Sequence, residues 1–528
     1  MTSSAFLPNS NTTSSSSGSG TNTTEDDENV LLVMDPEMTT VSSMTVPPSL
    51  ESTEDTTSTT GSTSHDDDMM REGTLMSARM NLLTSMVGGG SLSLPLAFHQ
   101  AGNAVIAPIS MILIAVSMEA SIQCLIASGL AVAGTTTRKK GTVTLEQVAC
   151  AAFGPMAKYG TMALVFFICF FTLVGYGVLL RDLLQPLTDT LLGPSANNNT
   201  FMFAVVLLIT PLTTLSSLTA LKHIGAFSMM SVFVMACCVS YRAIQCNASS
   251  DHTHGNNHNK SWNVTILPHS IQDVLQSLPI LISVYVCQFN VLPVHNELRN
   301  PTPKRIQSFV RSTYAICTIF YIALGFLGSL YNNCLLSTSN KLQSNILKNF
   351  PDSDPIIFFG RVCLTLTIAF AFPVLVLPAR NVILNTTNTT TEQQQLQQQQ
   401  QVSSFVQDAA IQNDLHEKLL PPQATSTTTV KKDCIWKRRL ISIAITWIAT
   451  AIASCVSSIA VVWDFLGSSL SILLAFVLPC GSYLMLVSKE NKTIYLRIMS
   501  ILIISLSIPI MIIGTSNAFY TTFIRKQL

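Results

Sequence analysis

Three consecutive glycines and a proline interrupt an apolar run that is long enough to enter a membrane. The run extends from Met80 to Phe98, with glycines at positions 88–90 and a proline at 95. Glycine stabilises a helix poorly, and proline donates no backbone hydrogen bond. Because an unpaired amide is costly in hydrocarbon, such a break must be buried in protein or line a cavity that a polar ligand occupies. Amides freed at Gly88–Ser91, at the start of a half-helix, would suit the carboxylate of a ligand.

A second apolar run becomes polar toward one end. It extends from Ser277 to Leu298 and contains Gln288, Asn290 and Pro293 near that end. Polar side chains are costly in lipid, so this end is expected to face protein, a cavity or the cytosol. Carbonyl groups freed near residues 286–290 would suit an ammonium group.

The three glycines of the first run have an alternative interpretation, as a face for close helix packing. Three in a row with a nearby proline favour a binding site instead.

The composition places both runs in a helical membrane protein. The chain has 528 residues, of which 48% are hydrophobic and 11% are charged, whereas soluble domains carry about 25% charged residues. Its mean hydropathy is +0.41. Apolar runs of about 20 residues recur about eleven times. These expected spans are Leu75–Phe98, Ala104–Val132, Met156–Leu184, Phe201–Leu221, Ile224–Ile244, Ile271–Val294, Phe309–Leu330, Ile356–Leu377, Leu440–Val462, Leu466–Val487 and Ile494–Phe519.

The two interrupted runs are the first and sixth of these spans. They begin two halves of five spans each, the spacing of an inverted repeat whose ligand site lies at the repeat interface, and span eleven is an addition. We therefore expect an all-α membrane protein in four parts. These are a Ser/Thr-rich, disordered cytosolic tail at 1–70, spans one to eight at 71–380, a low-complexity cytosolic loop at 381–435, and spans nine to eleven at 436–528.

Loop charge predicts the orientation. Lysine and arginine gather in the loops after spans two, six, eight and ten, which places these loops and the N-terminus in the cytosol. Four N-x-Ser/Thr glycosylation triplets fall on the opposite side. They begin at Asn198, Asn247, Asn259 and Asn263. Cys246 and Cys334 lie at span ends on that side, which is oxidising during secretory folding, so a disulfide is expected. The alternative is two unpaired thiols.

Three motifs in order give the chain a family resemblance. They are GTLMSARMNLLTSMVGGGSLSLPLAF at 73–98, CQFNVLPVHNELRNPTPKRI at 287–306 and FPVLVLPARNVI at 372–383. They resemble the first, sixth and eighth spans of the amino acid/auxin permeases, with the sodium-coupled neutral amino acid transporters and the vacuolar amino acid transporters as the nearest branches. The resemblance covers about residues 73–520. It implies a LeuT-like fold, alternating access and an amino acid substrate.

With that substrate, the two interrupted spans supply the expected contacts. The expected substrate-binding residues are Thr84, Gly88, Gly89, Gly90, Ser91, Cys287, Gln288 and Asn290. Neutral amino acids are favoured because no arginine within the spans clearly faces the site. The sequence does not choose among them.

The resemblance also bears on the coupling ion. Sodium-coupled relatives commonly have Asn where Thr84 stands and Thr where Ala369 and Ala371 stand, and each change weakens an oxygen ligand that a hard cation needs. The family histidine of span six is replaced by Gln288, which cannot titrate. A proton is therefore expected over sodium, and no metal or other cofactor is expected. Thr84 and Thr367 are the alternative cation site.

Acidic residues within the spans are candidates for carrying the proton. Glu119 is the first, since it lies in an apolar run with no charge nearby in the sequence. The alternative is a protonated carboxyl that is hydrogen bonded to a neighbouring helix for structure alone. Asp464, between expected spans nine and ten, is interpreted as a turn residue. Asp182 beside Arg181 is interpreted as a local ion pair or a solvated cap.

The remaining features concern location and competing functions. Residues Asp27–Leu32 read DENVLL, an acidic dileucine pattern that a sorting adaptor could read, which favours a vacuolar or lysosomal membrane over the plasma membrane. The alternative functions are a sodium-coupled symporter and an amino acid sensor of the same fold. No paired catalytic cluster or phosphate-binding loop indicates an enzyme, and the net charge of +0 indicates no nucleic-acid partner.

Overall fold

Helices make up all the regular structure in the part of the chain that the computed structural model describes. That part is residues 74–135, 143–193, 198–214, 222–249, 264–268, 270–298, 302–335, 341–410, 427–488 and 493–520. The first half contains α2 (Leu75–Met86), η1 (Gly89–Ser93), α3 (Leu94–Ala101), α4 (Ile106–Thr135), α5 (Leu145–Phe153), α6 (Pro155–Leu192), α7 (Asn198–Thr213) and α8 (Lys222–Ser249). The second half contains α9 (Ile271–Ser283), α10 (Gln288–Glu297), α11 (Pro303–Ser329), α12 (Asn332–Leu335), η4 (Ile346–Asn349), α13 (Pro355–Ala410), α14 (Thr427–Cys455), α15 (Ile459–Phe465), η5 (Leu466–Leu470), η6 (Leu473–Val477), α16 (Leu478–Leu486) and α17 (Ile494–Phe519).

Most of these helices are long and apolar enough to cross a membrane. By length and composition, nine of the described segments qualify, and Asn199–Thr213 is a shorter apolar helix. The interrupted segment from α2 to α3 would complete the eleven spans that the sequence predicts, and this total stays a prediction. The order of the helices agrees with the expected order.

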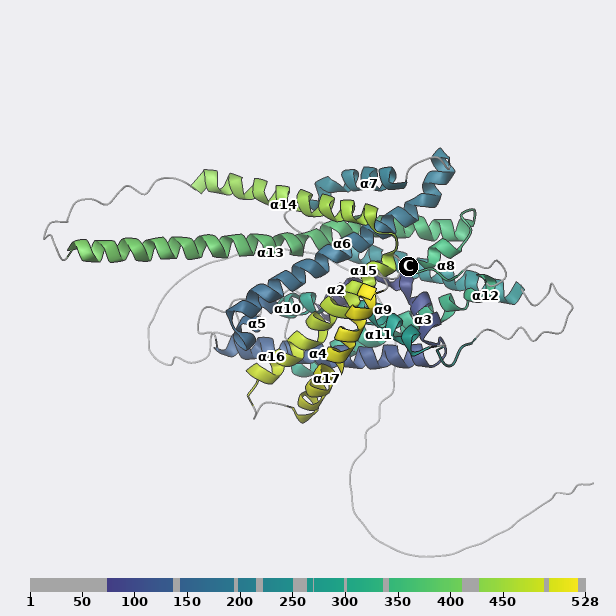
Figure 1. The fold of residues 1–528 in the computed structure, drawn as a ribbon, viewed down its shortest axis with the longest axis horizontal. Helices are drawn as coiled ribbons and strands as arrows, with labels where there is room; N and C mark the ends of the chain where they lie inside the picture. The colour runs from purple at the N-terminus through teal and green to yellow at the C-terminus, as the bar shows by residue number, and fades with distance from the viewer. Residues whose placement is uncertain are drawn as a thin grey trace, which may run out of the picture. The chain divides into compact units, whose positions relative to one another are not determined.

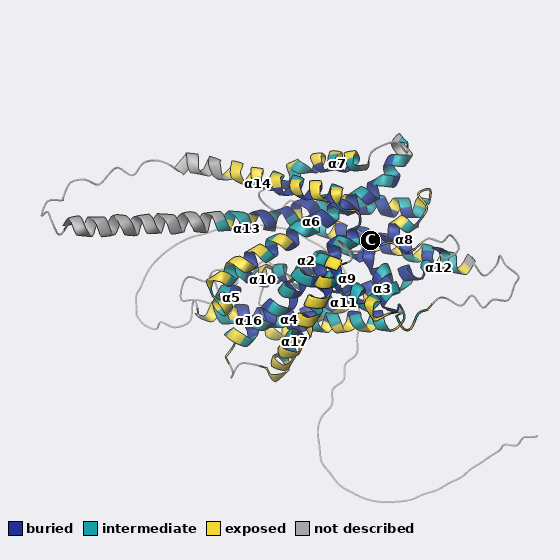
Figure 2. Ribbon diagram, in the orientation of Figure 1, coloured by how far each residue is buried: buried dark blue, intermediate teal, exposed yellow. Residues whose placement is uncertain are grey.

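Burial follows the pattern of a helix bundle in lipid. In Figure 2 the buried residues gather in the middle of the bundle, around α2, α9 and α11, whereas α7, α14 and α17 carry exposed faces. Large apolar side chains are exposed on the outer helices, including Leu113, Leu208 and Ile512. Such surfaces are suited to lipid because the helices satisfy their own backbone hydrogen bonds. Helix α6 packs against α13 and α14 (Figure 1), and α11 packs against α3 and α4.

Both expected interruptions are present. Helix α2 ends at Met86, and the chain resumes as a 3-10 turn at Gly89 that leads into α3. Helix α9 ends at Ser283, and α10 begins at Gln288. Short half-helices therefore replace continuous spans at the two positions where glycine, proline and polar residues interrupt the apolar pattern.

The ninth and tenth spans divide at a different place from the one predicted. Span nine was expected to reach Val462, but α14 ends at Cys455 and α15 begins at Ile459. Ser458 caps the new helix, because its hydroxyl oxygen accepts a hydrogen bond from the Ala460 amide at 3.3 Å. Asp464 therefore lies inside a helix, and its interpretation as a turn residue is wrong. After it the helix continues through two π-helical turns, η5 and η6.

The eighth span also ends differently. A low-complexity loop was expected from residue 381, but α13 continues to Ala410. Residues 393–401 are rich in glutamine, which forms helices readily when no glycine or proline interrupts it. The expected tail at 1–70, the sorting motif at Asp27–Leu32 and residues 411–426 of the loop lie outside the described residues.

One end of the bundle is tied together by covalent and ionic contacts. Cys246 in α8 and Cys334 in α12 are joined, with their Cα atoms 6.4 Å apart, inside the range that disulfides require. Arg242, one turn earlier in α8, pairs with Asp354, with 2.7 Å between Nε and Oδ2. We call the end of the bundle that carries Cys246, Cys334 and Asp354 the disulfide face; it lies near the label α12 in Figure 1.

Candidate functional site

The glycine bend between α2 and α3 is shaped by a close approach from α6. A Cβ atom at position 88 would collide with the Tyr176 hydroxyl group, and one at position 89 would lie 2.6 Å from Leu179 Cδ2. The backbone at Gly88 is extended, with φ −149°, so the absence of a side chain matters here for space and not for backbone freedom. A Cβ atom at position 90 would lie 3.5 Å from Val284 Cγ1, an ordinary contact.

Some backbone amides at this bend have an acceptor and others do not. The Ser91 amide donates to the Gly88 carbonyl at 3.1 Å, and the Ser91 hydroxyl donates to the same oxygen at 2.8 Å. The backbone of Gly89 is hydrogen bonded to the Tyr176 hydroxyl. Within the described residues, the amides of Gly88 and Gly90 have no hydrogen-bond acceptor. They are the free donors that a carboxylate could use.

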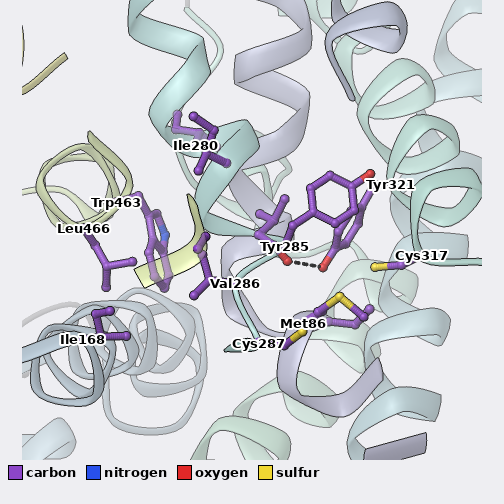
Figure 3. Packing of buried hydrophobic residues seen from close by; sticks show 14 of the residues in the cluster. Met86, Ile168, Ile280, Tyr285, Val286, Cys287, Cys317, Tyr321, Trp463 and Leu466 are labelled. Carbon is purple, nitrogen blue, oxygen red and sulfur yellow. Dashed lines mark hydrogen bonds between the residues drawn. The ribbon is translucent and has the colours of Figure 1, made fainter. Parts of the chain in front are cut away.

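The opposite wall of the bend is the turn between α9 and α10. Val284 from this turn contacts the position of Gly90, and the indole ring of Trp463 from α15 lies 3.7 Å from the same position. Figure 3 shows Trp463 and Val286 side by side, with Tyr285 and Tyr321 on the other side of the turn. Two buried polar atoms here have no hydrogen-bond partner in the described part of the chain: the Ser93 hydroxyl and the Trp463 indole nitrogen.

Tyrosines of α11 occupy the carbonyl groups that the second break frees. Tyr321 donates to the Val284 carbonyl at 2.9 Å, and Tyr314 donates to the Tyr285 carbonyl at 3.2 Å. The Tyr285 hydroxyl in turn donates to Thr318 Oγ1 at 2.8 Å. No prediction from the sequence included this network. Its signal was the spacing of Tyr314, Thr318 and Tyr321, which places three hydroxyl groups on one face of a helix.

The polar residues expected to bind substrate in span six also make contacts within the protein, and their role in substrate binding stays a prediction. Gln288 is fully buried; its side-chain oxygen accepts from the Cys287 amide at 3.0 Å, and its nitrogen lies 3.2 Å from Met118 Sδ. Asn290 donates to Ser85 Oγ at 2.7 Å, which ties α10 to α2. The Cys287 sulfur lies 3.3 Å from the Tyr314 hydroxyl. These contacts hold the two interrupted spans together and leave the bend itself for a ligand.

Thr84 and Thr367 both donate hydrogen bonds to carbonyl groups. The Thr84 hydroxyl donates to Met80 at 2.7 Å and faces Gly225 of α8 at 3.4 Å. The Thr367 hydroxyl donates to Cys363, one turn earlier in α13, at 3.1 Å. Each hydroxyl oxygen keeps lone pairs, so the alternative cation site stays a prediction.

The carboxyl group of Glu119 has a charged partner on another helix. Its Oε1 atom lies 3.0 Å from the guanidinium Nε of Arg311 and accepts from Gln123 at 3.0 Å. The expectation of a carboxyl without a charged partner is therefore wrong. Arg311 lies 192 residues further along the chain, in α11, so no local pattern could have revealed it. Asp182, by contrast, pairs with Arg181 at 3.7 Å as expected, and also with Lys348 at 3.0 Å.

The four glycosylation triplets have different surroundings. Asn247 lies inside α8, and its side-chain nitrogen donates to the Ala243 and Leu330 carbonyls at 2.7 and 3.2 Å. A glycan attached to that nitrogen would disrupt both bonds, so the contacts of Asn247 do not favour its glycosylation. Asn198 is the first residue of α7. Asn259 and Asn263 lie outside the described residues.

A family model and several curated relatives match this chain. The family model described as transmembrane amino acid transporter protein matches residues 71–520. The vacuolar amino acid transporter 7 of Saccharomyces cerevisiae is 22% identical over 327 residues, covering 60% of this chain and 60% of that relative. The amino acid transporter AVT6E of Arabidopsis thaliana is 22% identical over 469 residues, covering 85% of this chain and 83% of that relative. Mouse solute carrier family 38 member 10 is 32% identical over 115 residues, covering 22% of this chain and 10% of that relative.

The first three curated relatives extend well beyond the aligned part. The chain spans 10%, 60% and 27% of their lengths. The third is a putative sodium-coupled neutral amino acid transporter 10 from Xenopus laevis.

A solved structure shares the fold. It is Mhp1, a nucleobase-cation-symport-1 family transporter in a closed conformation with bromovinylhydantoin bound. The TM-score is 0.50 at 12% identity, covering 86% of this chain and 92% of that chain. A likeness at this identity concerns the fold alone, and it confirms the LeuT-like architecture that the resemblance implied.

Proposed function

We propose that this chain, which belongs to the family of transmembrane amino acid transporter proteins, moves amino acids across a membrane by alternating access. The observation that carries the proposal is the pair of free amides at Gly88 and Gly90, of which Gly90 packs against Val284 of the other interrupted span. Half-helix ends at a repeat interface are where secondary transporters bind the carboxylate of a substrate. The Tyr176 hydroxyl, in contact with the same backbone, adds a further donor.

The surroundings of the bend favour a neutral amino acid. The residues that approach the glycines are Tyr176, Leu179, Val284 and Trp463, and none of them is charged. A charged substrate side chain would be costly there without a partner. The substrate carboxylate needs only the two amides and the hydroxyl, because charge-assisted hydrogen bonds from neutral donors stabilise an anion.

The coupling ion is proposed to be a proton. The substitutions at Thr84, Ala369 and Ala371 weaken the oxygen ligands that sodium needs in similar proteins. The proposed location is a vacuolar or lysosomal membrane, with the N-terminus in the cytosol. The similarity to a vacuolar amino acid transporter of yeast supports this location.

Uptake by the purified protein in proteoliposomes tests the function. A mixed set of radiolabelled amino acids is offered under a pH gradient alone and under a sodium gradient alone. The proposal expects accumulation of neutral amino acids driven by the pH gradient. Accumulation driven by sodium alone would replace the proton with a cation site that includes Thr84 and Thr367. No uptake or exchange by folded protein would contradict transport and shift support to a sensor.

A further inference from the structure

A partly polar cavity lies beside α3, the half-helix that follows the glycine bend. This end of α3 is on the side of the disulfide face, because Asn103 donates to Ser329 Oγ at 3.2 Å and the neighbouring Leu330 carbonyl accepts from Asn247, the residue after Cys246, at 3.2 Å. The cavity has a volume of about 190 Å³ and lies between α3, α9, α15 and α17. Its polar lining consists of Gln100, Gln276, Asp464 and Asn517, and the other lining residues are apolar or small. At a share of ~30 Å³ for each water in the liquid, the space is large enough for several waters.

Asp464 is the acidic residue in this lining, and no lysine, arginine or histidine lines the cavity with it. Within the described residues, Asp464 has no hydrogen bond and no ion pair. Two other acids of the long helices, Glu119 and Asp182, differ in this respect. Glu119 lies 3.0 Å from Arg311, and Asp182 lies 3.0 Å from Lys348.

Titratable groups on the neighbouring elements do not compensate for this carboxyl. Helix α9 carries Asp273, and α3 carries His99 next to Gln100, but neither lines the cavity. Helix α17 carries Arg497 in its first turn, at the far end from Asn517. The charged pair of α6 near this face, Arg181 and Asp182, is engaged with itself and with Lys348.

An unpaired carboxylate inside a membrane protein is costly, so its charge must be removed by a proton or balanced by a cation. The surrounding amides suit an exchange between the two states. Each primary amide can donate to a carboxylate through its nitrogen or accept from a carboxylic acid through its oxygen. Gln100 and Gln276 can therefore accompany Asp464 in either form.

The helices that line the cavity also adjoin the two breaks of the proposed substrate site. Gln100 lies in α3, the half-helix that follows the glycine bend, and Gln276 lies in α9, the half-helix that precedes the second break. Trp463, the residue before Asp464, lies 3.7 Å from the Gly90 position. Directly after α15 the chain forms the π-helical turn η5, an irregularity that often marks functional sites.

We propose that Asp464 is the carboxyl that takes up and releases the coupling proton, from water in this cavity, on the side of the disulfide face. A hydronium ion in the cavity transfers its proton to a carboxylate oxygen of Asp464, which becomes neutral. The carboxylic acid returns the proton to water on the opposite side of the membrane when alternating access exposes Asp464 there. Neutralising Asp464 turns a hydrogen-bond acceptor into a donor toward Gln100 of α3 and Gln276 of α9, and thereby changes the positions of both half-helices around the substrate. The inference rests on the proposed function, and it assigns the proton to a residue other than Glu119.

Two assays on the same proteoliposomes separate coupling from substrate binding. One assay measures accumulation of a neutral amino acid driven by a pH gradient. The other measures counterflow, the exchange of labelled for unlabelled amino acid without any gradient. For Asp464→Asn we expect loss of pH-driven accumulation with counterflow retained. The matched control is Asp273→Asn, the same substitution outside the cavity, which should keep both activities; Glu119→Gln should keep both as well.

The other outcomes are equally informative. Unchanged pH-driven accumulation in Asp464→Asn, or an equal loss of both activities, would overturn the proposal. If that variant does not reach the membrane, Asp464→Glu replaces it, and a shifted pH midpoint of accumulation is expected; an unshifted profile would count against the role. Absence of counterflow in the unsubstituted protein would contradict the proposed function itself, which distinguishes the two failures.

Discussion

The hydroxyl oxygen of Tyr176 lies so close to the backbone of residue 88 that a Cβ atom on any residue other than glycine would collide with it. The bend in the first span and the middle of α6 are therefore fitted to each other. The fit leaves the Gly88 amide without an acceptor among the described residues. Any side chain at position 88 must displace the tyrosine and, with it, one of the three proposed donors to the substrate.

Gly88→Ala is expected to slow amino acid uptake about tenfold or more. Overpacking of this kind costs about 1–3 kcal/mol, and ~1.4 kcal/mol on the substrate-bound state corresponds to tenfold in rate. Removing the colliding oxygen by adding Tyr176→Phe should restore part of the uptake, since the next atom of the ring lies 3.6 Å away. Initial rates of the single and double variants in proteoliposomes measure this coupling.

The neighbouring glycine supplies a control for that experiment. A Cβ atom at Gly90 would meet Val284 and Trp463 at 3.5 and 3.7 Å, which are favourable separations for carbon atoms. Gly90→Ala should therefore keep uptake within about twofold of the unsubstituted rate. Equal losses in Gly88→Ala and Gly90→Ala would show that the bend tolerates no added carbon anywhere and would remove the special role of Tyr176.

Glu119→Gln is expected to leave the pH dependence of transport unchanged. The glutamine keeps the size of the side chain and can still bond to Gln123, but it loses the pair with Arg311. That arginine side chain is 66% exposed, and exposed pairs contribute only about 0–1 kcal/mol. The uptake rate measured as a function of pH for both proteins checks this. A displaced pH profile in the variant would return Glu119 to the proton pathway.

Glu119 and Asp464 show which features of the site a sequence can reveal. The breaks after Met86 and after Ser283 were predictable because glycine, proline and polar residues act through the local backbone. The partner of Glu119 was not, because Arg311 lies on another helix 192 residues away. Asp464 was misplaced for a third reason: the apolar residues around Val462 extend the pattern of span nine across a helix boundary, and only the cap at Ser458 marks that boundary.

Similar limits apply to the polar residues of span six. Their position toward the break was visible, and the expectation that they face protein or a cavity agrees with their contacts. Their partners were not visible, because Asn290 bonds to Ser85 and Gln288 approaches Met118 only after the helices pack. Fold class was predictable from motif order. Which polar residues bond to neighbouring helices depends on tertiary packing, and the sequence alone does not show it.

The ion pair between Asp354 and Arg242 should make the stability of the disulfide face depend on acid pH. Burial alone would raise the pKa of Asp354, but hydrogen bonds from Arg242 and from the Ile356 and Ile357 amides outweigh it and hold the pKa below its ordinary value. Because the folded protein binds this proton less tightly than the unfolded chain, the pair stabilises the fold above the ordinary aspartate pKa of about 3.9. That contribution disappears as the pH falls through the lower pKa of the folded state.

Asp354→Asn therefore should lower the Tm at pH 7 by a few degrees and have a shrinking effect toward pH 3. Thermal unfolding of the detergent-solubilised protein at several pH values measures the difference. Asp273→Asn, at an acid with no ion pair among the described residues, serves as the control. A difference in Tm that stays constant from pH 7 to pH 3 would exclude the proton-linked contribution of Asp354.

The Cys246–Cys334 disulfide should hold two parts of the chain together after cleavage between them. A protease site introduced at residues 251–263, between α8 and α9, lies between the two cysteines in sequence. Cleaved protein should migrate as one species without reductant and as two with it, whereas cleaved Cys246→Ser should migrate as two in both conditions. Cys455→Ser, at an exposed free cysteine, should behave as the unsubstituted protein does.

Loss of the bridge should also lower stability, typically by about 2–4 kcal/mol, because the cross-link restricts the unfolded chain. The loop that it closes is long, with a sequence separation of 88 between the cysteines, and the bridge lies beside the Arg242–Asp354 pair in the same end of α8. The Tm of Cys246→Ser should therefore fall, and a reductant should lower the Tm of the unsubstituted protein to a similar value. If the cleaved unsubstituted protein already migrates as two fragments without reductant, and if the Tm of Cys246→Ser is unchanged, the two thiols are neighbours but are not bonded.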